Sequence, residues 1–261
     1  NNETGGQLMQ EDLNRLSRWS TDWQMLFNVD KCKVIHFGNK SVEHVYYMGG
    51  SKLDAVKDIR DLGIIITDDL KPSSQCLQAY NRAARMLGMV RRTVKSRSAE
   101  ILVKLYKSLV RPHLEYAVLA WSPYYKKDKE LIERVQHRFT RMFKRLKTED
   151  YKQRLKVLSL WSLEERRNRA NLLEVYKMMK GISKTPIGNF FDVGSDDRTR
   201  GHSLRIRKKQ STRDLRLHFF SQRAVNRWNM LDQPTVDAAS INVFKNHLQR
   251  IYSARMGLCE D

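Results

Sequence analysis

Hydrophobic residues recur at helical spacing near the start of the chain and then change to a pattern typical of strands. Leucines and tryptophans three or four residues apart predict an amphipathic helix from about Glu11 to Met25. The stretch from Val29 to Phe37 is rich in β-branched and aromatic residues and predicts a strand. Lys31 and Lys33 lie on one face of that strand, and the same face becomes apolar at its end.

Two further extended segments precede a long helical region. Gly49 and Gly50 stand between short strand-like stretches and predict a hairpin turn. The residues from Ile59 to Thr67 predict another strand, whereas Pro72 suits the first turn of a helix and not a strand. The sequence therefore predicts a small β-containing region that ends near residue 70.

Helical spacing dominates from residue 71. The first helix is predicted to gather its apolar residues on one face, formed by Leu77, Tyr80, Ala84, Leu87 and Val94. Its polar residues fall on nearly the opposite face, formed by Gln75, Gln78, Arg82, Arg85 and Arg92. The next helix is predicted to break or kink at Pro112.

Two more helices are predicted before residue 182. The first covers residues 126–146, with an apolar face formed by Leu131, Val135, Phe139, Met142 and Leu146. The second begins at a capping box made by Ser162 and Glu165, runs to Lys180 and stops at Gly181.

The pattern loosens over residues 182–202, which are rich in Gly, Pro and polar residues and predict a boundary. Residues 205–210 alternate like a strand or an extended arm, and residues 214–231 and 240–252 predict two short closing helices. We therefore expect an α+β fold that is predominantly α-helical. Its predicted regions are 1–70, 71–181 and 182–261.

Charge changes this picture by indicating a partner. The chain has 261 residues, and 49 Lys and Arg against 29 Asp and Glu give a formal net charge of +20. An apolar share of 41% indicates a folded chain. Such an excess of positive charge favours a polyanion, above all nucleic acid, as the partner.

The basic residues gather where acids are few. Four arginines step by four, three and four residues along the predicted helix 126–146 and should form one basic ribbon, namely Arg134, Arg138, Arg141 and Arg145. Two further candidate sets are Arg82, Arg85 and Arg92, and Arg205, Arg207, Lys208 and Lys209. The alternative is an ordinary solvated helix surface, but acids are scarce around the last two sets, and Glu130 and Glu133 lie too far round the helix or too near its start to neutralise the ribbon. We therefore predict phosphate contacts at these residues.

Candidates for metal and catalytic chemistry are weak. The two adjacent aspartate pairs, Asp68-Asp69 and Asp196-Asp197, occur where a turn or helix cap is the favoured interpretation. Cys32, Cys76 and Cys259 are far apart and odd in number, so neither a disulfide framework nor a zinc site is predicted. We predict no metal site and no complete catalytic site.

The start of the chain has no signal-peptide pattern and no initiator Met, which suggests a fragment or a processed chain. Its apolar runs are shorter than the roughly 18 residues of a spanning helix. We expect an intracellular protein, nuclear or cytoplasmic, without a membrane partner.

The order of several segments resembles one family. These segments are DLNRLSRWSTDWQMLFNVDKCKVIHFG, DLGIIITDDLKPSSQC, LYKSLVRPHLEYAVLAWSPYYKKDKELIERVQHRFTR, RTRGHSLRIRKK and FFSQRAVNRWNML. Together they resemble the C-terminal part of reverse transcriptases, the RNA-directed DNA polymerases, of non-LTR (LINE-type) retrotransposons. The likeness is to the chicken-repeat and jockey type, and it covers nearly the whole chain.

The resemblance implies a role for each region. It places residues 1–70 at the end of the palm and residues 71–181 in a helical thumb, followed by a basic C-terminal region. Asn28 and Lys31 match the Asn-x-x-Lys pattern, which implies an accessory role for Lys31 near the incoming nucleotide. Leu62, Gly63 and Ile64 resemble the primer-grip turn, where a glycine lets the primer backbone approach.

The resemblance also implies what this chain lacks. The catalytic Asp-Asp hairpin and the fingers of the family would precede residue 1, so Mg²⁺ is expected only in the full-length polymerase and no cofactor on this chain. The chain alone is expected to be inactive. Implied partners are an RNA template, an RNA–DNA or DNA duplex, and the upstream half of the polymerase. A stand-alone nucleic-acid-binding protein and a helical protein–protein adaptor stay open as alternatives.

Overall fold

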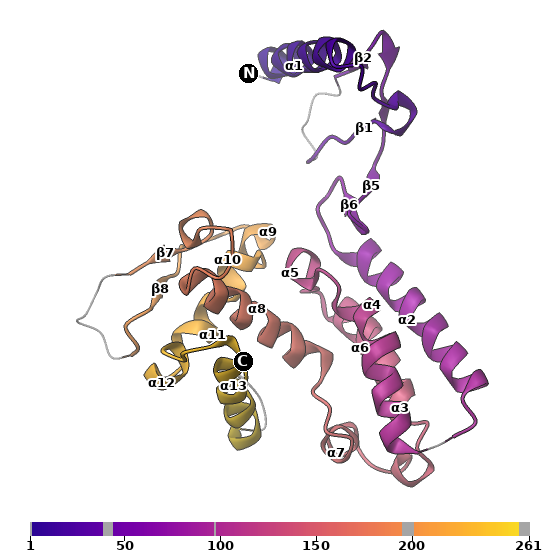
Figure 1. Cartoon of the computed structure of the whole chain (residues 1–261), viewed down its shortest axis with the longest axis vertical. Coiled ribbons are helices and arrows are strands. Elements are labelled where there is room, and N and C mark those ends of the chain that lie inside the picture. The colour runs from indigo at the N-terminus through magenta and orange to yellow at the C-terminus, as the bar shows by residue number, and fades with distance from the viewer. Residues whose placement is uncertain (1, 39–43, 97, 195–200, 256–261) are drawn as a thin grey trace. The chain divides into compact units, whose positions relative to one another are not determined.

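A computed structural model describes residues 2–38, 44–96, 98–194 and 201–255 (Figure 1). The structure is 58% helix and 8% strand, which confirms the α+β, predominantly helical class. Its contacts divide the chain into two compact units, Asn1–Gln75 (unit 1) and Cys76–Asp261 (unit 2). Residues 182–261, predicted as a separate region, lie in the same unit as the helices that precede them.

Unit 1 begins with helix α1 (Asn2–Asp22), which starts earlier than the predicted Glu11. Glycine is unfavourable inside a helix, so Gly5 and Gly6 gave no sign in the sequence that the helix extends to Asn2. Gly6 allows a close contact, because a Cβ atom there would stand 2.7 Å from Nδ1 of His44.

The predicted strand from Val29 to Phe37 is largely wrong. Val29–Lys31 forms a 3₁₀ turn (η1), and only β1 (Lys33–Val34) pairs, in parallel with β4 (Asp54–Ala55). The Nζ of Lys33 lies 2.7 Å from Oδ2 of Asp54. That ammonium lowers the pKa of the Asp54 carboxyl. The hydrophobic pattern located the two paired residues but could not reveal that the rest of the stretch finds no partner strand.

Two hairpins complete unit 1. The predicted turn at Gly49 and Gly50 is confirmed between β2 (Tyr47–Met48) and β3 (Ser51–Lys52). The predicted single strand from Ile59 to Thr67 is instead a hairpin of β5 (Asp58–Asp61) and β6 (Ile64–Thr67).

Helix α2 (Ser73–Thr93) buries a face that is shifted from the predicted one and shares only Leu87 with it. Its buried apolar residues are Cys76, Ala79, Ala83, Leu87 and Val90. Leu77, which the sequence pattern placed on the apolar face, is 51% exposed. Small side chains form this face, so the hydrophobic pattern, which is weighted by large residues, misplaced it.

The predicted break at Pro112 appears as a change of helix type. Helix α3 (Ala99–Leu105) continues into a π-helical segment, η2 (Tyr106–Val110), and α4 begins at the proline itself (Pro112–Glu115). A proline tolerates the first helical position because it has no N–H to pair. The short helix α5 (Val118–Trp121) follows.

Helix α6 (Lys126–Thr140) leads through the 3₁₀ turn η3 (Lys144–Leu146) and α7 (Tyr151–Val157) to α8 (Leu163–Met179). The N-cap half of the predicted capping box is confirmed, since the Ser162 hydroxyl accepts a hydrogen bond of 3.1 Å from the Glu165 N–H. Gly181 follows the helix with φ +65°, as a C-terminal stop requires.

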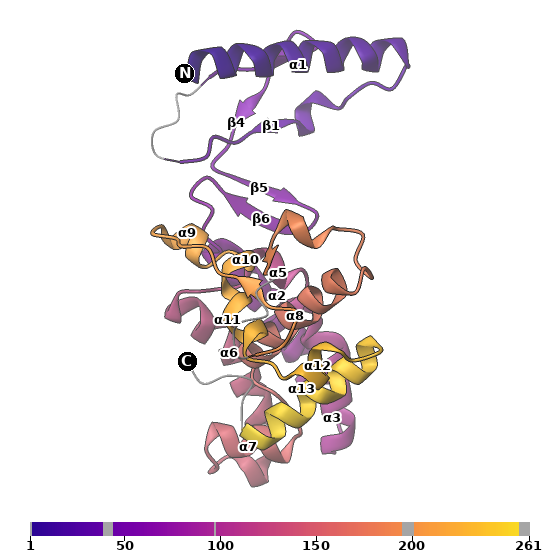
Figure 2. The same ribbon diagram turned by 90° about the vertical axis from the view of Figure 1, so that its left-hand side faces the viewer.

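The C-terminal part of unit 2 packs on α8. Its elements are η4 (Ile187–Asn189), β7 (Asp192–Val193), β8 (Ile206–Arg207), α9 (Asp214–Leu217), α10 (Phe220–Arg223), α11 (Val225–Asn229), α12 (Gln233–Val236) and α13 (Ile241–Arg255). The single helix predicted over residues 214–231 is therefore three short ones. Both views show α11 and α13 beside α8 (Figures 1 and 2).

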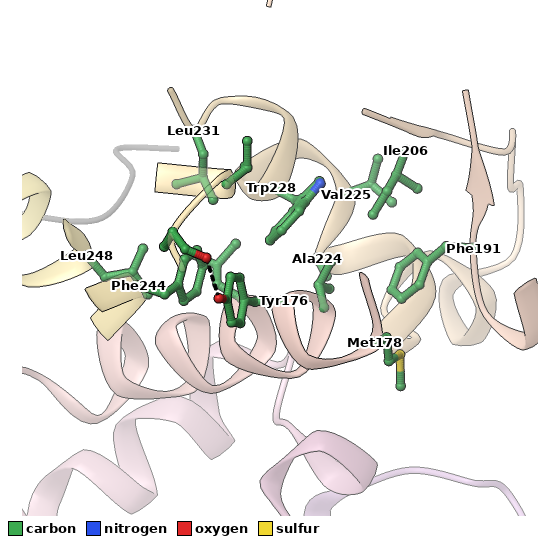
Figure 3. Packing of buried hydrophobic residues seen from close by; sticks show 14 of the residues in the cluster. Tyr176, Met178, Phe191, Ile206, Ala224, Val225, Trp228, Leu231, Phe244 and Leu248 are labelled. Atoms are coloured by element: carbon green, nitrogen blue, oxygen red, sulfur yellow. Dashed lines mark hydrogen bonds between the residues drawn. The ribbon is translucent and has the colours of Figure 1, made fainter. Parts of the chain in front are cut away.

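Aromatic residues fill the core between these helices (Figure 3). Trp228 of α11 is fully buried, and its indole N–H donates to the Leu204 carbonyl at 2.7 Å. The ring of Tyr176 stacks on Phe244 with centroids 4.3 Å apart, and its hydroxyl donates to the Ala238 carbonyl at 2.6 Å. This core holds α8 in place against the C-terminal helices.

Candidate nucleic-acid interface

The four arginines of the predicted ribbon are all exposed, but they do not share one helix. Arg134 and Arg138 lie on α6, which ends at Thr140, so Arg141 is its C-terminal cap and Arg145 lies on η3. The prediction of a continuous helical ribbon is wrong in this respect. The chain turns after Thr140, and Phe143 then packs edge-on against Phe139 with centroids 5.5 Å apart.

One contact joins this surface to α2. The Arg138 guanidinium lies over the Tyr80 ring, 5.6 Å from its centroid. On α2, Arg85 and Arg92 are exposed and Arg82 is half-buried. We use the term α2–α6 basic surface for Arg82, Arg85, Arg92, Arg134, Arg138, Arg141 and Arg145.

Positive charge on the α2–α6 basic surface is uncompensated. Among the residues that the structure describes, none of its seven arginines forms an ion pair. Glu133 of α6 cannot neutralise it, because this carboxylate accepts hydrogen bonds from the Tyr151 hydroxyl and the Leu163 N–H inside the fold. Glu130 lies 3.9 Å from the Lys126 ammonium instead. Such a surface can contact phosphates without first breaking internal pairs.

The third predicted set is less available. Arg207 of β8 is exposed but stands opposite Asp192 in the hairpin, and the Lys209 ammonium lies 3.0 Å from the Asp192 carboxylate. Arg205 is half-buried and lies against Gly201, while Lys208 is exposed. One acid thus reduces the charge of this segment.

Unit 1 holds the two remaining predicted site residues. Lys31 is exposed at the end of η1, two residues before the start of β1. Gly63 forms the turn between β5 and β6 together with Leu62, and both have positive φ, +86° and +44°. Two consecutive positive φ values are typical of a type I′ hairpin turn, and the Leu62 side chain is 82% exposed at its tip.

We expect Gly63→Val to destabilise the β5–β6 hairpin, because a β-branched residue at φ +86° is strained by about 1–2 kcal/mol. Gly63→Asn should restore most of this loss, since asparagine tolerates positive φ. Amide hydrogen exchange of Ile64–Thr67 would measure both. Equal protection in the Val variant and the native chain would contradict the turn geometry.

The aspartate pair Asp68-Asp69 does not offer a free carboxylate pair for Mg²⁺. Asp69 accepts hydrogen bonds from the Thr67 hydroxyl at 2.7 Å and the Lys71 N–H at 3.0 Å, and pairs with the Lys71 ammonium at 2.9 Å. These contacts, the Lys71 ammonium first, lower the pKa of Asp69 to about 2. The turn interpretation is confirmed here, whereas Asp196 and Asp197 lie outside the described residues.

Sequence patterns missed a group of buried arginines. Arg154 and Arg167 are each 3% exposed. Arg111 and Arg166 are half-buried around Glu115, and the Arg166 Nη2 atom donates to that carboxylate at 2.9 Å. The sequence held one indication: none of the basic residues in segment 152–169 has an acidic residue four positions later to pair with on a helix. Arginine is so rarely buried that this pattern alone does not predict burial.

No protein-family model, curated protein or solved structure matches this chain. Across the described residues, every helix is too short or too polar to cross a lipid bilayer. Function must therefore be inferred from the geometry and charge of the chain itself.

Proposed function

We propose that this chain is the C-terminal portion of a non-LTR retrotransposon reverse transcriptase and holds the template–primer duplex through phosphate contacts. The observation that carries the proposal is the α2–α6 basic surface, whose exposed arginines have no acidic partners among the described residues. Phosphate contacts of this kind position a duplex without reading its sequence. An RNA–DNA duplex is therefore the expected partner, with little base preference.

The resemblance supports the rest of the proposal. It assigns an accessory role at the incoming nucleotide to Lys31, which is exposed, and a primer-backbone contact to Gly63 at the tip of its hairpin. Polymerisation itself is assigned to the upstream half, because Asp68 and Asp69 form a turn and not a metal-binding pair. No catalytic step is assigned to this chain.

A stand-alone nucleic-acid-binding protein would use the same surface, so the binding assay supports both hypotheses. An in-frame upstream segment that ends in an aromatic-x-Asp-Asp hairpin distinguishes the polymerase from it. The protein–protein adaptor predicts a different result, since its affinity for a duplex would change little with salt.

Binding to an RNA–DNA duplex should weaken steeply as salt rises. The sharpest variant changes Arg134, Arg141 and Arg145 to Gln, because these side chains are exposed and Gln keeps helix propensity. We expect the slope of log affinity against log salt to shrink by up to about three units, roughly one for each phosphate that the variant no longer binds. Thermal stability should change by less than about 0.5 kcal/mol.

A control variant removes the same charge elsewhere, by changing the exposed residues Lys57, Lys184 and Arg250 to Gln. It should leave the slope nearly unchanged. Equal slopes for the two variants would show that net charge, and not the α2–α6 basic surface, governs binding. Arg138→Gln is measured separately, because its stacking on Tyr80 also contributes to folding.

A further inference from the structure

A cavity of about 220 Å³ lies in unit 2 between α6, α8 and the segment from α9 to α11. Four cationic side chains line it, namely Lys129, Arg167, Arg223 and Arg227. Glu164 is the one carboxylate among its lining residues, and Asn168 and Asn171 add carboxamides. A lining of this composition is complementary to an anion.

The one lining carboxylate is already paired. The Glu164 carboxylate is engaged with the Lys129 ammonium at 2.6 Å. The two Nη atoms of Arg223 donate to backbone carbonyls, at 3.0 Å to His218 and 2.6 Å to Leu119. Its Nε has no hydrogen-bond partner among the described residues.

Arg167 gives the strongest indication. It is 3% exposed, yet neither of its Nη atoms has a hydrogen-bond partner in the described part of the chain. The carboxylates of Glu133, Glu164 and Glu115 attract Arg167 electrostatically, but none of them accepts a hydrogen bond from its Nη atoms. A buried guanidinium whose two Nη atoms lack hydrogen-bond acceptors is costly, and it suggests that an acceptor from outside the chain completes the site.

Burial of the two arginines agrees with this interpretation. Burial, and then the nearby charge of Arg167, lower the pKa of Arg223 to about 10. Burial also lowers the pKa of Arg167. An anion in the cavity would stabilise both charged forms.

We infer that this cavity binds a phosphate group, with Arg167 and Asn168 as donors and Lys129 and Arg227 supplying further charge. The volume of the cavity limits the size of the ligand. Pockets for small-molecule ligands measure about 300–1,000 Å³, so this smaller cavity suits a single phosphate and a few waters of about 30 Å³ each, not a whole nucleotide. The phosphate site is independent of the proposed function, because it is a discrete cavity rather than an exposed surface.

Inorganic phosphate is the probe for the first test. At about 100 times Kd it should raise the melting temperature of the chain by about 5–10 °C, while chloride at equal ionic strength should not. Calorimetric titration would give the affinity and a stoichiometry of one. Equal shifts in phosphate and chloride would overturn the inference.

A competition experiment identifies the molecule that supplies the phosphate group to this cavity. A 5′-phosphorylated oligonucleotide that displaces inorganic phosphate, where the same oligonucleotide without the phosphate does not, would assign the site to a nucleic-acid terminus. Failure of both to compete would assign it to free phosphate. Both results support the site, and neither requires the α2–α6 basic surface to bind a duplex.

A matched pair of variants tests the location. Lys129→Gln removes a lining cation and releases the Glu164 charge into the cavity, so phosphate affinity should fall by about 10-fold or more. Lys127→Gln removes an exposed lysine from the same helix and should leave the affinity unchanged. Equal affinities in these two variants would overturn the assignment.

Replacing a buried arginine could unfold the chain, so the third variant adds a charge instead. Asn168→Asp should raise the melting temperature without phosphate, because it supplies the missing anion, and should abolish the phosphate-dependent shift. A lower melting temperature with an intact phosphate shift would contradict the inference.

Discussion

Replacing Trp228 with alanine should lower the free energy of unfolding of unit 2 by about 3–5 kcal/mol, because it leaves a large cavity in the core. The side chain is fully buried among Tyr176, Phe244 and their neighbours (Figure 3). Its loss also removes the 2.7 Å hydrogen bond to the Leu204 carbonyl. Since small domains are stable by only about 5–15 kcal/mol, this change alone should leave unit 2 marginally stable.

Urea denaturation followed by helical circular dichroism would measure this effect. Trp23→Ala is the control, because Trp23 is 67% exposed and its replacement should change stability by less than about 0.5 kcal/mol. If the loss for Trp228 were below about 1 kcal/mol, residues 201–255 would not be docked on α8 as the structure has them.

Elements fixed by local chemistry were predictable from the sequence. The Ser162 cap, the Gly181 stop and the Gly49-Gly50 turn each require one residue type at one position, and all three are present. The predominance of helix follows in the same way from long stretches of 3.6-residue periodicity.

Elements fixed by tertiary packing were not predictable. The apolar spacing of Phe139, Met142 and Leu146 continues a helical pattern, yet α6 ends at Thr140 and Leu146 is buried from η3 instead. On α2, Cys76, Ala79 and Ala83 face the core because small side chains permit close approach. Periodicity alone cannot distinguish these solutions.

Some residues of the candidate sites could also be predicted from the sequence, and others could not. Exposed arginines on α2 and α6 could be found because solvent exposure is the ordinary state of an arginine on an amphipathic helix. The cavity with Arg167 and Arg223 could not, because its residues come from separate segments that only the fold brings together.

Replacing Glu133 should cause the second large loss of stability. Its carboxylate accepts hydrogen bonds from the Tyr151 hydroxyl and from the Leu163 N–H. The Leu163 nitrogen lies 3.2 Å from Oε1 and 3.1 Å from Oε2 of Glu133. Gln136, which is fully buried, extends the network by donating to the Tyr151 oxygen at 3.0 Å and accepting from the Tyr106 hydroxyl at 2.8 Å. Glu133→Ala should therefore cost about 3 kcal/mol or more, because it leaves buried donors without acceptors.

Glu133→Gln separates the charge from the hydrogen bonds. Burial raises the pKa of Glu133 above its ordinary value of 4.5, against the opposing effects of Tyr151, Leu163 and Arg167. The folded state thus binds this proton more tightly than the unfolded state. The resulting stability is present below pH 4.5 and is lost as pH rises through the folded-state pKa.

Because Gln is a neutral acceptor of the same size, its variant should lack this pH-dependent loss. As pH rises above 4.5, we expect the Glu133→Gln variant to become more stable relative to the native chain. The Glu133→Ala variant should stay less stable than the native chain at every pH. Glu130→Gln, on the exposed side of α6, is the control and should show no such trend. A relative stability of Glu133→Gln that falls with rising pH would mean that the ionised carboxylate is the favoured form, and that its attraction to Arg167 outweighs the cost of burial.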